Sequence, residues 1–289
     1  MTYASISIWN ETERALPLDL AVSSLFSANR KYSKDEVKDV VILSKSGCNI
    51  TYTGPSLGTD DMDVLMALSH LARGAKSSGD TLEVVTSFAE LLAALEWPTQ
   101  RHYYDKLDDC LVRLSRAHLN LKAFGGPTGK RVVKHIFGTL LGVTQVLESG
   151  DGRERTISTP ISRSMLQMWQ ELVLVSWTQR KLLKRNLSRW LQSYVLFGDA
   201  NEREYLIDDL MVMSKFEGDR PEFRRRLKEA CDELVHVNFL SSYSVTRINA
   251  RMVSGEANKS ITFLTGNTRK GAAAKRAELA SPLQLCLGD

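Results

Sequence analysis

The segment IDDLMVMSKF, residues 207–216, is followed by EGDR, residues 217–220, and then by PEFRRRLKEACDELV, residues 221–235. Apolar residues recur at helical spacing in the first and third pieces, and Gly218 lies in the break between them. A short helix, a turn containing glycine and a longer helix form the helix-turn-helix arrangement, whose second helix enters the major groove of DNA. The segment therefore predicts a DNA-binding unit in the C-terminal part of the chain.

The longer helix of this segment has one apolar and one basic side. Its apolar side chains fall on one side, and they are Phe223, Leu227, Ala230 and Leu234. The candidate DNA contacts of the basic side are Arg220, Arg224, Arg225 and Lys228. Cationic groups near the start of such a helix can reach guanine edges or phosphates. The alternative is a solvated surface on which the arginines pair with Glu222, Glu229 and Glu233.

The flanking sequence completes a winged-helix order. A helix is predicted over residues 178–197, a short strand over 203–206, and a hairpin wing from residues 239–248 and 260–264. One face of the predicted 178–197 helix carries Lys181, Lys184 and Arg185. These three side chains either follow the phosphate backbone or form ordinary protein surface.

The N-terminal half repeats this order of elements. Helices are predicted over residues 60–73, 87–95 and 101–118, with a strand near 82–85 and a hairpin beginning at 119. Leu107, Leu114 and Leu119 each lie 120 residues before an apolar counterpart, namely Leu227, Leu234 and Phe239. This register favours a structural repeat. The helix over 101–118 offers weaker candidate DNA contacts in Arg101, Lys106 and Arg113, because aspartates lie among them.

The fold class predicted from these elements is α+β, with two tandem winged-helix domains. The predicted division is a flexible N-terminus over residues 1–15, an N-terminal winged-helix domain over 16–165, a C-terminal winged-helix DNA-binding domain over 175–265, and a flexible basic tail over 266–289. A chain of 289 residues is long enough for two domains that each bury a core.

Charge and cysteine usage restrict the function classes. Residues 176–277 carry 19 Lys and Arg against 12 Asp and Glu, whereas residues 1–175 carry 19 against 20, so a polyanionic partner is expected for the C-terminal half. The cysteines are Cys48, Cys110, Cys231 and Cys286, which stand singly, as in a reduced cytoplasmic protein. No signal peptide and no membrane span are expected.

The sequence shows no motif for catalysis, a cofactor or a metal. GGPTGKR, residues 125–131, departs from the GxxxxGK phosphate loop in its spacing and in Arg131, so a wing turn is the better interpretation. We expect a protein that is not an enzyme and that needs no cofactor. The tail contains Gln284, Leu285 and Leu287, which resemble the peptide motif that binds the bacterial sliding clamp, but Gly288 replaces the final Phe of that motif. A frayed terminus is the favoured alternative.

Several stretches resemble the TrfA family of plasmid replication initiators. They are LPLD with LFSA between residues 16 and 28, DDMDVLMALSHLAR over 60–73, LEWP over 95–98, WL with LFGD between 190 and 199, and FRRRLKEACDEL over 223–234. The resemblance covers about residues 15–245. It implies two winged-helix domains that bind repeated sites, called iterons, in double-stranded DNA at a plasmid origin. It also implies origin opening, recruitment of the host initiator and replicative helicase, and a monomer–dimer equilibrium.

The sequence therefore predicts a plasmid replication initiator located in the bacterial cytoplasm. A winged-helix transcriptional repressor that binds operator DNA is the alternative. A nicking enzyme is a more distant one, because His102-Tyr103-Tyr104 has no metal-binding histidine pair beside it.

Overall fold

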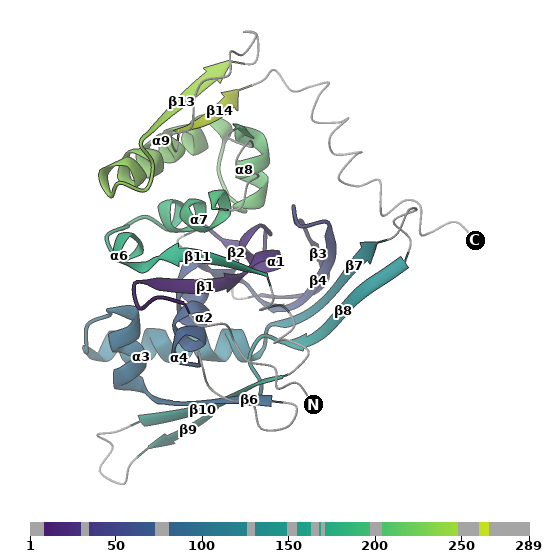
Figure 1. Cartoon of the computed structure of the whole chain (residues 1–289), viewed down its shortest axis with the longest axis vertical. Coiled ribbons are helices and arrows are strands. Elements are labelled where there is room, and N and C mark those ends of the chain that lie inside the picture. Colours follow the sequence, from purple (N-terminus) through teal and green to yellow (C-terminus); the bar gives the residue numbers. More distant parts are fainter. Residues whose placement is uncertain are drawn as a thin grey trace.

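A computed structural model describes most of the chain. The described residues are 9–29, 35–72, 81–125, 131–148, 155–162, 168, 171–196, 204–247 and 260–265. Along the long axis of the molecule, the last helices and strands of the chain lie at one end, and the strands β6 (Thr81–Ser87), β9 (Gln145–Glu148) and β10 (Arg155–Ser162) lie at the other (Figure 1). Helices and strands are mixed throughout, so the predicted α+β class is confirmed.

The elements before residue 165 form the larger part of the molecule. The short first elements are β1 (Glu13–Pro17), α1 (Leu18–Ala21), β2 (Phe26–Ser27) and β5 (Leu57–Gly58). The longer strands are β3 (Glu36–Ile42), β4 (Cys48–Pro55), β6 (Thr81–Ser87), β7 (His118–Gly125), β8 (Arg131–Thr139), β9 (Gln145–Glu148) and β10 (Arg155–Ser162). The helices are α2 (Thr59–Ala72), α3 (Phe88–Leu95) and α4 (Arg101–Ser115).

The largest sheet is antiparallel, with the strand order β3-β4-β7-β8. Alternate residues of its strands face the core, and Ile50, Leu119, Leu121 and Ile136 are fully buried there. The predicted hairpin after α4 is confirmed by the antiparallel β7–β8 pair. A separate sheet has the order β6-β10-β9.

Helix α2 is the centre of the core. Every residue from Thr59 to Ala72 except Leu71 is buried, so this helix is enclosed on all sides and not on one apolar face alone. Helices α3 and α4 pack against it. The predicted start of the 87–95 helix is confirmed by a capping box, in which the Ser87 side chain accepts a hydrogen bond from the Glu90 amide and Glu90 accepts one from the Ser87 amide.

The first described residues are packed against this core. Strand β1 pairs antiparallel with β11 (Leu172–Ser176), although the two are far apart in sequence. Trp9 and Arg14 are buried, and both donate hydrogen bonds to Nδ1 of His70 on α2, each over 3.2 Å. The flexible segment predicted over residues 1–15 is therefore too long, because Trp9 is buried and β1, which begins at Glu13, is paired with β11. Residues 1–8 lie outside the described residues.

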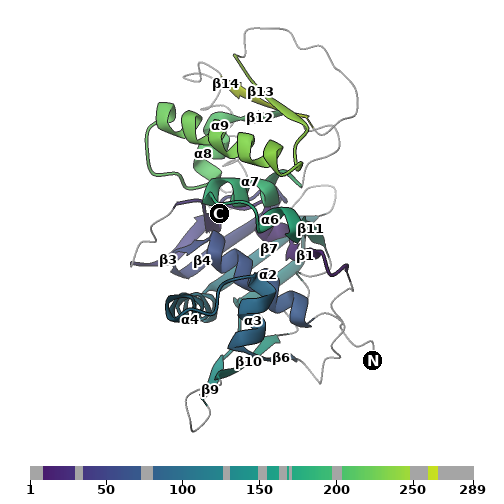
Figure 2. The same ribbon diagram turned by 90° about the vertical axis from the view of Figure 1, so that its left-hand side faces the viewer.

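The C-terminal elements form a second group at the other end. They are α6 (Trp177–Arg180), α7 (Asn186–Val195), β12 (Glu204–Leu206), α8 (Ile207–Met213), α9 (Arg220–His236), β13 (Ser242–Arg247) and β14 (Ser260–Thr265). Helix α9 lies between these last strands and α7 (Figures 1 and 2). None of the helices described is long and apolar enough to cross a membrane.

Two predictions for this group are wrong. The helix predicted over residues 178–197 is interrupted, and residues 181–185 connect α6 to α7. The predicted hairpin is replaced by parallel pairing of β13 with β14, and β12 also pairs parallel with β14. Since residues 248–259 separate β13 from β14, the connection has on the order of the dozen residues that a parallel crossover requires.

The two halves share a detail of backbone geometry in addition to their common order of elements. Glu96 after α3 and Lys215 after α8 both adopt the left-handed conformation, with φ of 54° and 52°. Each is followed by an aromatic residue that packs on the next helix, Trp97 on Tyr103 and Phe216 on Phe223. The halves differ in their sheets, because β6 pairs with β10 and not with the β7–β8 hairpin. The domain division remains a prediction.

Candidate nucleic-acid interface

Helices α8 and α9 follow one another across a short connection, in the order that the sequence predicts. Helix α8 ends at Met213, earlier than predicted, and the turn extends to Asp219. The Asp219 side chain caps α9 by accepting a hydrogen bond from the Glu222 amide over 2.8 Å, and Pro221 fits the first turn because its missing N–H is not needed there. Four apolar side chains of α9 are buried as predicted, and they are Phe223, Leu227, Ala230 and Leu234.

The opposite side of α9 presents cations to solvent. We call Arg220, Arg224, Arg225, Arg226 and Lys228 the basic face of α9. The side chains of Arg220, Arg225 and Arg226 are 41%, 61% and 50% exposed. Arg226 is not among the predicted contacts. Its guanidinium nevertheless extends over the Phe216 ring, 5.5 Å from the ring centroid, and remains half exposed.

Carboxylates accompany several of these cations. Arg220 pairs with Asp208 over 2.9 Å, Arg226 pairs with Glu222 over 2.6 Å, and Arg225 pairs with Glu229. The alternative of internal pairing is thus partly realised. Exposed pairs of this kind contribute about 0.2–1 kcal/mol to stability. Phosphate oxygens can therefore compete with these carboxylates for the arginines.

The predicted contacts Lys181, Lys184 and Arg185 lie in the α6–α7 connection and not on a helix face. All three side chains are exposed. Lys181 pairs with Glu96 over 3.0 Å, and Arg185 Nε lies 3.5 Å from a carboxylate oxygen of Glu229 on α9. Arg185 is therefore brought beside the basic face of α9, whereas Lys181 points to the N-terminal half.

Glu233 of α9 explains the interruption between α6 and α7. Its carboxylate accepts hydrogen bonds from the amides of Lys184 and Arg185, over 2.7 and 3.3 Å, and from the Ser188 hydroxyl. Helix α7 has no capping side chain of its own at Arg185. Glu233, only 10% exposed, takes that place and fixes α9 against the start of α7.

The three N-terminal candidates differ in how firmly they are held. Arg101 is exposed at the start of α4. Lys106 pairs with Asp60 over 2.9 Å and lies 4.1 Å from the centroid of the Trp97 ring. Arg113 pairs over 2.9 Å with Asp61, which is fully buried. Of these, Arg101 is the most accessible to an external ligand.

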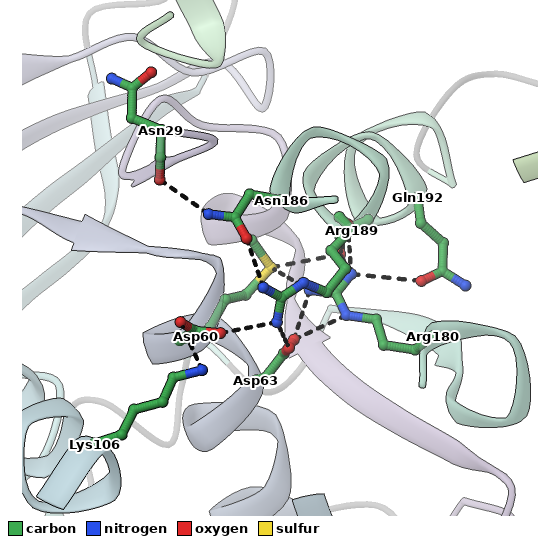
Figure 3. Close-up of polar contacts among 10 residues, drawn as sticks. Asn29, Asp60, Asp63, Lys106, Arg180, Asn186, Arg189 and Gln192 are labelled. Atoms are coloured by element: carbon green, nitrogen blue, oxygen red, sulfur yellow. Dashed lines mark hydrogen bonds and ion pairs between the residues drawn. The ribbon is translucent and has the colours of Figure 1, made fainter. Parts of the chain in front are cut away.

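Two aspartates of α2 and two arginines of the α6–α7 region join the halves of the molecule. We call Asp60, Asp63, Arg180 and Arg189 the buried charge network (Figure 3). Arg180 is 1% exposed and donates to Asp63 through Nε and Nη2, over 2.8 and 2.6 Å. Arg189 Nη1 contacts Asp60 over 2.9 Å and Asp63 over 2.7 Å. The network holds α7, and with it α9, to the N-terminal core.

Within the buried charge network, the surroundings favour the ionised forms of Asp60 and Arg189 and oppose that of Arg180. Burial opposes ionisation of Asp60, but Arg189 and Lys106 outweigh it and lower the pKa of Asp60. Burial likewise opposes the charge of Arg189, yet Asp63 and Asp60 raise its pKa. The pKa of Arg180 is lowered because burial outweighs its attraction to Asp63. Each charge therefore depends on its partners.

A polar chain extends the network to the helix-turn-helix. Asn186 accepts a hydrogen bond from Arg189 over 2.6 Å and donates one to the Asn29 carbonyl over 3.0 Å (Figure 3). The Asn29 side chain in turn donates to the Lys215 carbonyl over 2.7 Å, in the turn between α8 and α9. This connection is not among the predictions from the sequence. The aspartates at 60, 61 and 63, in a helix that is otherwise largely apolar, were the available signal.

Some predicted features lie outside the described residues. They are the tail over 266–289 and its residues Gln284, Leu285 and Leu287. Among the described residues, no group of three or more His, Cys, Asp or Glu side chains could hold a metal ion.

The sequence of the chain matches a known protein family and one of its members. A family model described as TrfA protein matches residues 1–251. The plasmid replication initiator protein TrfA of Escherichia coli is 33% identical over 111 residues, which cover 38% of this chain and 28% of that relative. The match thus spans little more than a quarter of the relative's length.

Two solved structures of RctB match part of the chain. A selenomethionine derivative of its domains 2 and 3 matches with a TM-score of 0.49 and 14% identity, covering 75% of this chain and 85% of that one. A second structure of the same domains matches with a TM-score of 0.43 and 13% identity, covering 73% and 80%.

Proposed function

The chain belongs to the TrfA family, and on this basis we propose that it initiates plasmid replication by binding iteron repeats in double-stranded DNA at the origin. In this proposal the two halves are tandem winged-helix domains. Helices α3 and α4 form the helix-turn-helix of the first, and α8 and α9 form that of the second.

The observation that carries the proposal is the basic face of α9. Three arginines of one helix are 41–61% exposed, and that helix follows a turn and begins at a capped, solvent-facing end. A recognition helix requires this placement, because its first turns contact base edges and its flanks contact phosphates. Arg185 from the α6–α7 connection adds a cation beside the same face.

The N-terminal half has a supporting role in this proposal. Arg101 adds a phosphate contact, whereas Lys106 and Arg113 mainly hold α4 to α2 through Asp60 and Asp61. The same half is the proposed site of homodimer formation. Opening of the A·T-rich duplex, recruitment of the host initiator and helicase, and clamp contact through the tail are proposed from family membership. None of these steps requires catalysis by the chain itself.

A binding titration tests DNA recognition. The purified protein is titrated with its origin fragment and with a scrambled duplex, each at two salt concentrations. We expect the origin to bind on the order of a thousandfold more tightly. Equal, steeply salt-dependent binding to both duplexes would contradict the proposal.

A variant pair tests the location of the interface. Lys228→Ala should weaken binding to both duplexes and reduce the salt slope by about one unit, because one phosphate contact is lost. Lys38→Ala is the matched control, since Lys38 is exposed on β3. If the two substitutions had equal effects, α9 would not be part of the DNA interface.

Two cellular and enzymatic assays separate initiation from its alternatives. Loss of origin-dependent plasmid maintenance in an α9 variant supports an initiator, while retained maintenance with altered promoter repression supports a repressor. Cleavage of supercoiled origin DNA in the presence of magnesium would instead indicate a nicking enzyme.

A further inference from the structure

One carboxylate on α9 is shared by two arginines from different elements. Glu229 Oε1 pairs with Nη1 of Arg225, four residues earlier on the same helix. Its other oxygen, Oε2, lies 3.5 Å from Nε of Arg185 in the α6–α7 connection. Each oxygen of the carboxylate thus holds one guanidinium group.

Both arginines remain open to solvent despite this contact. The side chain of Arg225 is 61% exposed, that of Arg185 is 48% exposed, and that of Glu229 is 37% exposed. A guanidinium group has five N–H donors in a planar fork, so a single contact to a carboxylate leaves a second edge free. The free edge of Arg225 is the part that can meet a ligand.

A long side chain on a helix surface has no fixed orientation, because it samples many rotamers. An arginine loses about 2 kcal/mol of rotamer entropy when it is fixed, and part of that loss occurs before binding if a neighbouring carboxylate already holds the group. A guanine edge accepts two parallel hydrogen bonds from one guanidinium, so this contact depends strongly on orientation. A phosphate contact depends on it less.

We propose that Glu229 is a positioning residue for base reading, which holds Arg225 so that its free edge contacts a guanine in the major groove. The inference rests on the proposed function and adds a residue that determines specificity. Arg185, held by the other oxygen, contacts the adjacent phosphate.

The other acidic residues of α9 have different surroundings. Glu233 is nearly buried and is occupied by the amides at the start of α7. Glu222 pairs with Arg226 on its own helix. Glu233 also lies 3.9 Å from Nη1 of Arg185, but Glu229 is the α9 carboxylate that contacts both Arg185 and Arg225.

A double-mutant cycle tests this inference. The wild type, Glu229→Gln, Arg225→Ala and the double variant are titrated with the origin fragment and with the scrambled duplex. We expect Arg225→Ala to lower origin affinity about tenfold or more, and Glu229→Gln to lower it by about two- to fivefold. The double variant should equal Arg225→Ala, because Glu229 acts through Arg225.

The scrambled duplex and a charge control separate orientation from net charge. Glu229→Gln should bind the scrambled duplex at least as tightly as the wild type, because a negative charge has been removed. Glu217→Gln is the control, since Glu217 is exposed in the α8–α9 turn. This variant should not lose discrimination between the two duplexes.

Several outcomes would overturn the inference. Additive losses in the double variant would mean that Glu229 itself contacts a base, such as the amino group of cytosine. Equal changes on both duplexes, matched by Glu217→Gln, would mean that only net charge matters. An Arg225→Ala variant with wild-type origin affinity would refute the inference while leaving the proposed function intact. A wild type that does not discriminate would refute the proposed function first.

Discussion

The buried charge network and the basic face of α9 are built from the same chemical groups in opposite environments. Arg180 and Asp63 are 1% and 5% exposed, whereas Arg225 and Glu229 are 61% and 37% exposed. Water cannot replace either partner in the first pair, but it reaches both partners in the second. Pairs of the first kind hold the halves together, and pairs of the second kind remain available for exchange with DNA.

This difference decides what each arginine can do. Arg189 and Arg180 are tied to α2 by carboxylates whose loss would leave a buried cation without its partner. Arg225 gives up a contact of at most about 1 kcal/mol when it turns to a phosphate or a base. The number of arginines in the sequence therefore overestimates the DNA-binding surface, because some of them are buried in ion pairs and cannot contact DNA.

The largest expected effect comes from removing a buried carboxylate. Asp63→Ala leaves both Arg180 and Arg189 short of a partner, so the free energy of unfolding should fall by about 3–5 kcal/mol. Urea denaturation measures this change. Glu171→Ala, at an exposed carboxylate, is the control and should have little effect. A loss below about 1 kcal/mol for Asp63→Ala would show that the buried network behaves like the surface pairs.

The next effect is a pH dependence at the other end of α2. Burial, assisted by Arg14, lowers the pKa of His70 to about 4 from 6.5. The unfolded chain takes up this proton first, so stability should be full above pH 6.5 and should fall by up to about 3 kcal/mol as the pH approaches 4.

Unfolding of two histidine variants over this pH range provides the check. His70→Gln should flatten the profile between pH 6.5 and 4. His236→Gln, at the exposed end of α9, should keep the wild-type profile. Identical profiles for wild type and His70→Gln would refute the assignment.

A smaller effect is expected where the two regions meet. Glu233→Ala removes the acceptor for the Lys184 and Arg185 amides, and should lower the free energy of unfolding by about 1–3 kcal/mol. Because Glu233 fixes α9 on α7, origin binding should weaken as well. Stability that changes as little as in Glu222→Ala would mean that Glu233 does not cap α7.

The smallest effect on stability is expected at the exposed pair. Glu229→Gln should change the free energy of unfolding by less than about 0.5 kcal/mol. Urea denaturation under the conditions used for Asp63→Ala gives the direct comparison. A loss of more than about 2 kcal/mol would place Glu229 among the structural carboxylates.

Local signals made the helices largely predictable. Phe223, Leu227 and Leu234 recur at helical spacing, and the structure buries all three. Ser87 and Glu90 stand at capping-box spacing, and their reciprocal hydrogen bonds are present. These features depend on residues only a few positions apart, so they can be read from the chain directly.

Long-range partners could not be predicted in this way. The 178–197 segment has an uninterrupted helical pattern, and its break depends on Glu233, which lies far along the chain. Asp60, Asp63, Arg180 and Arg189 belong to separate segments, and only folding brings them together. The parallel β13–β14 pair likewise depends on a crossover that residue spacing does not specify.

The pairing of β1 with β11 has a consequence for synthesis of the protein on the ribosome. Glu13 pairs with Ser176, so β1 has no partner until β11 has been synthesised. During that time its backbone donors and acceptors are exposed, and nascent chains on one polysome can meet through them. Pairing with β11 therefore closes an edge that stays open while the residues between the two strands are being synthesised.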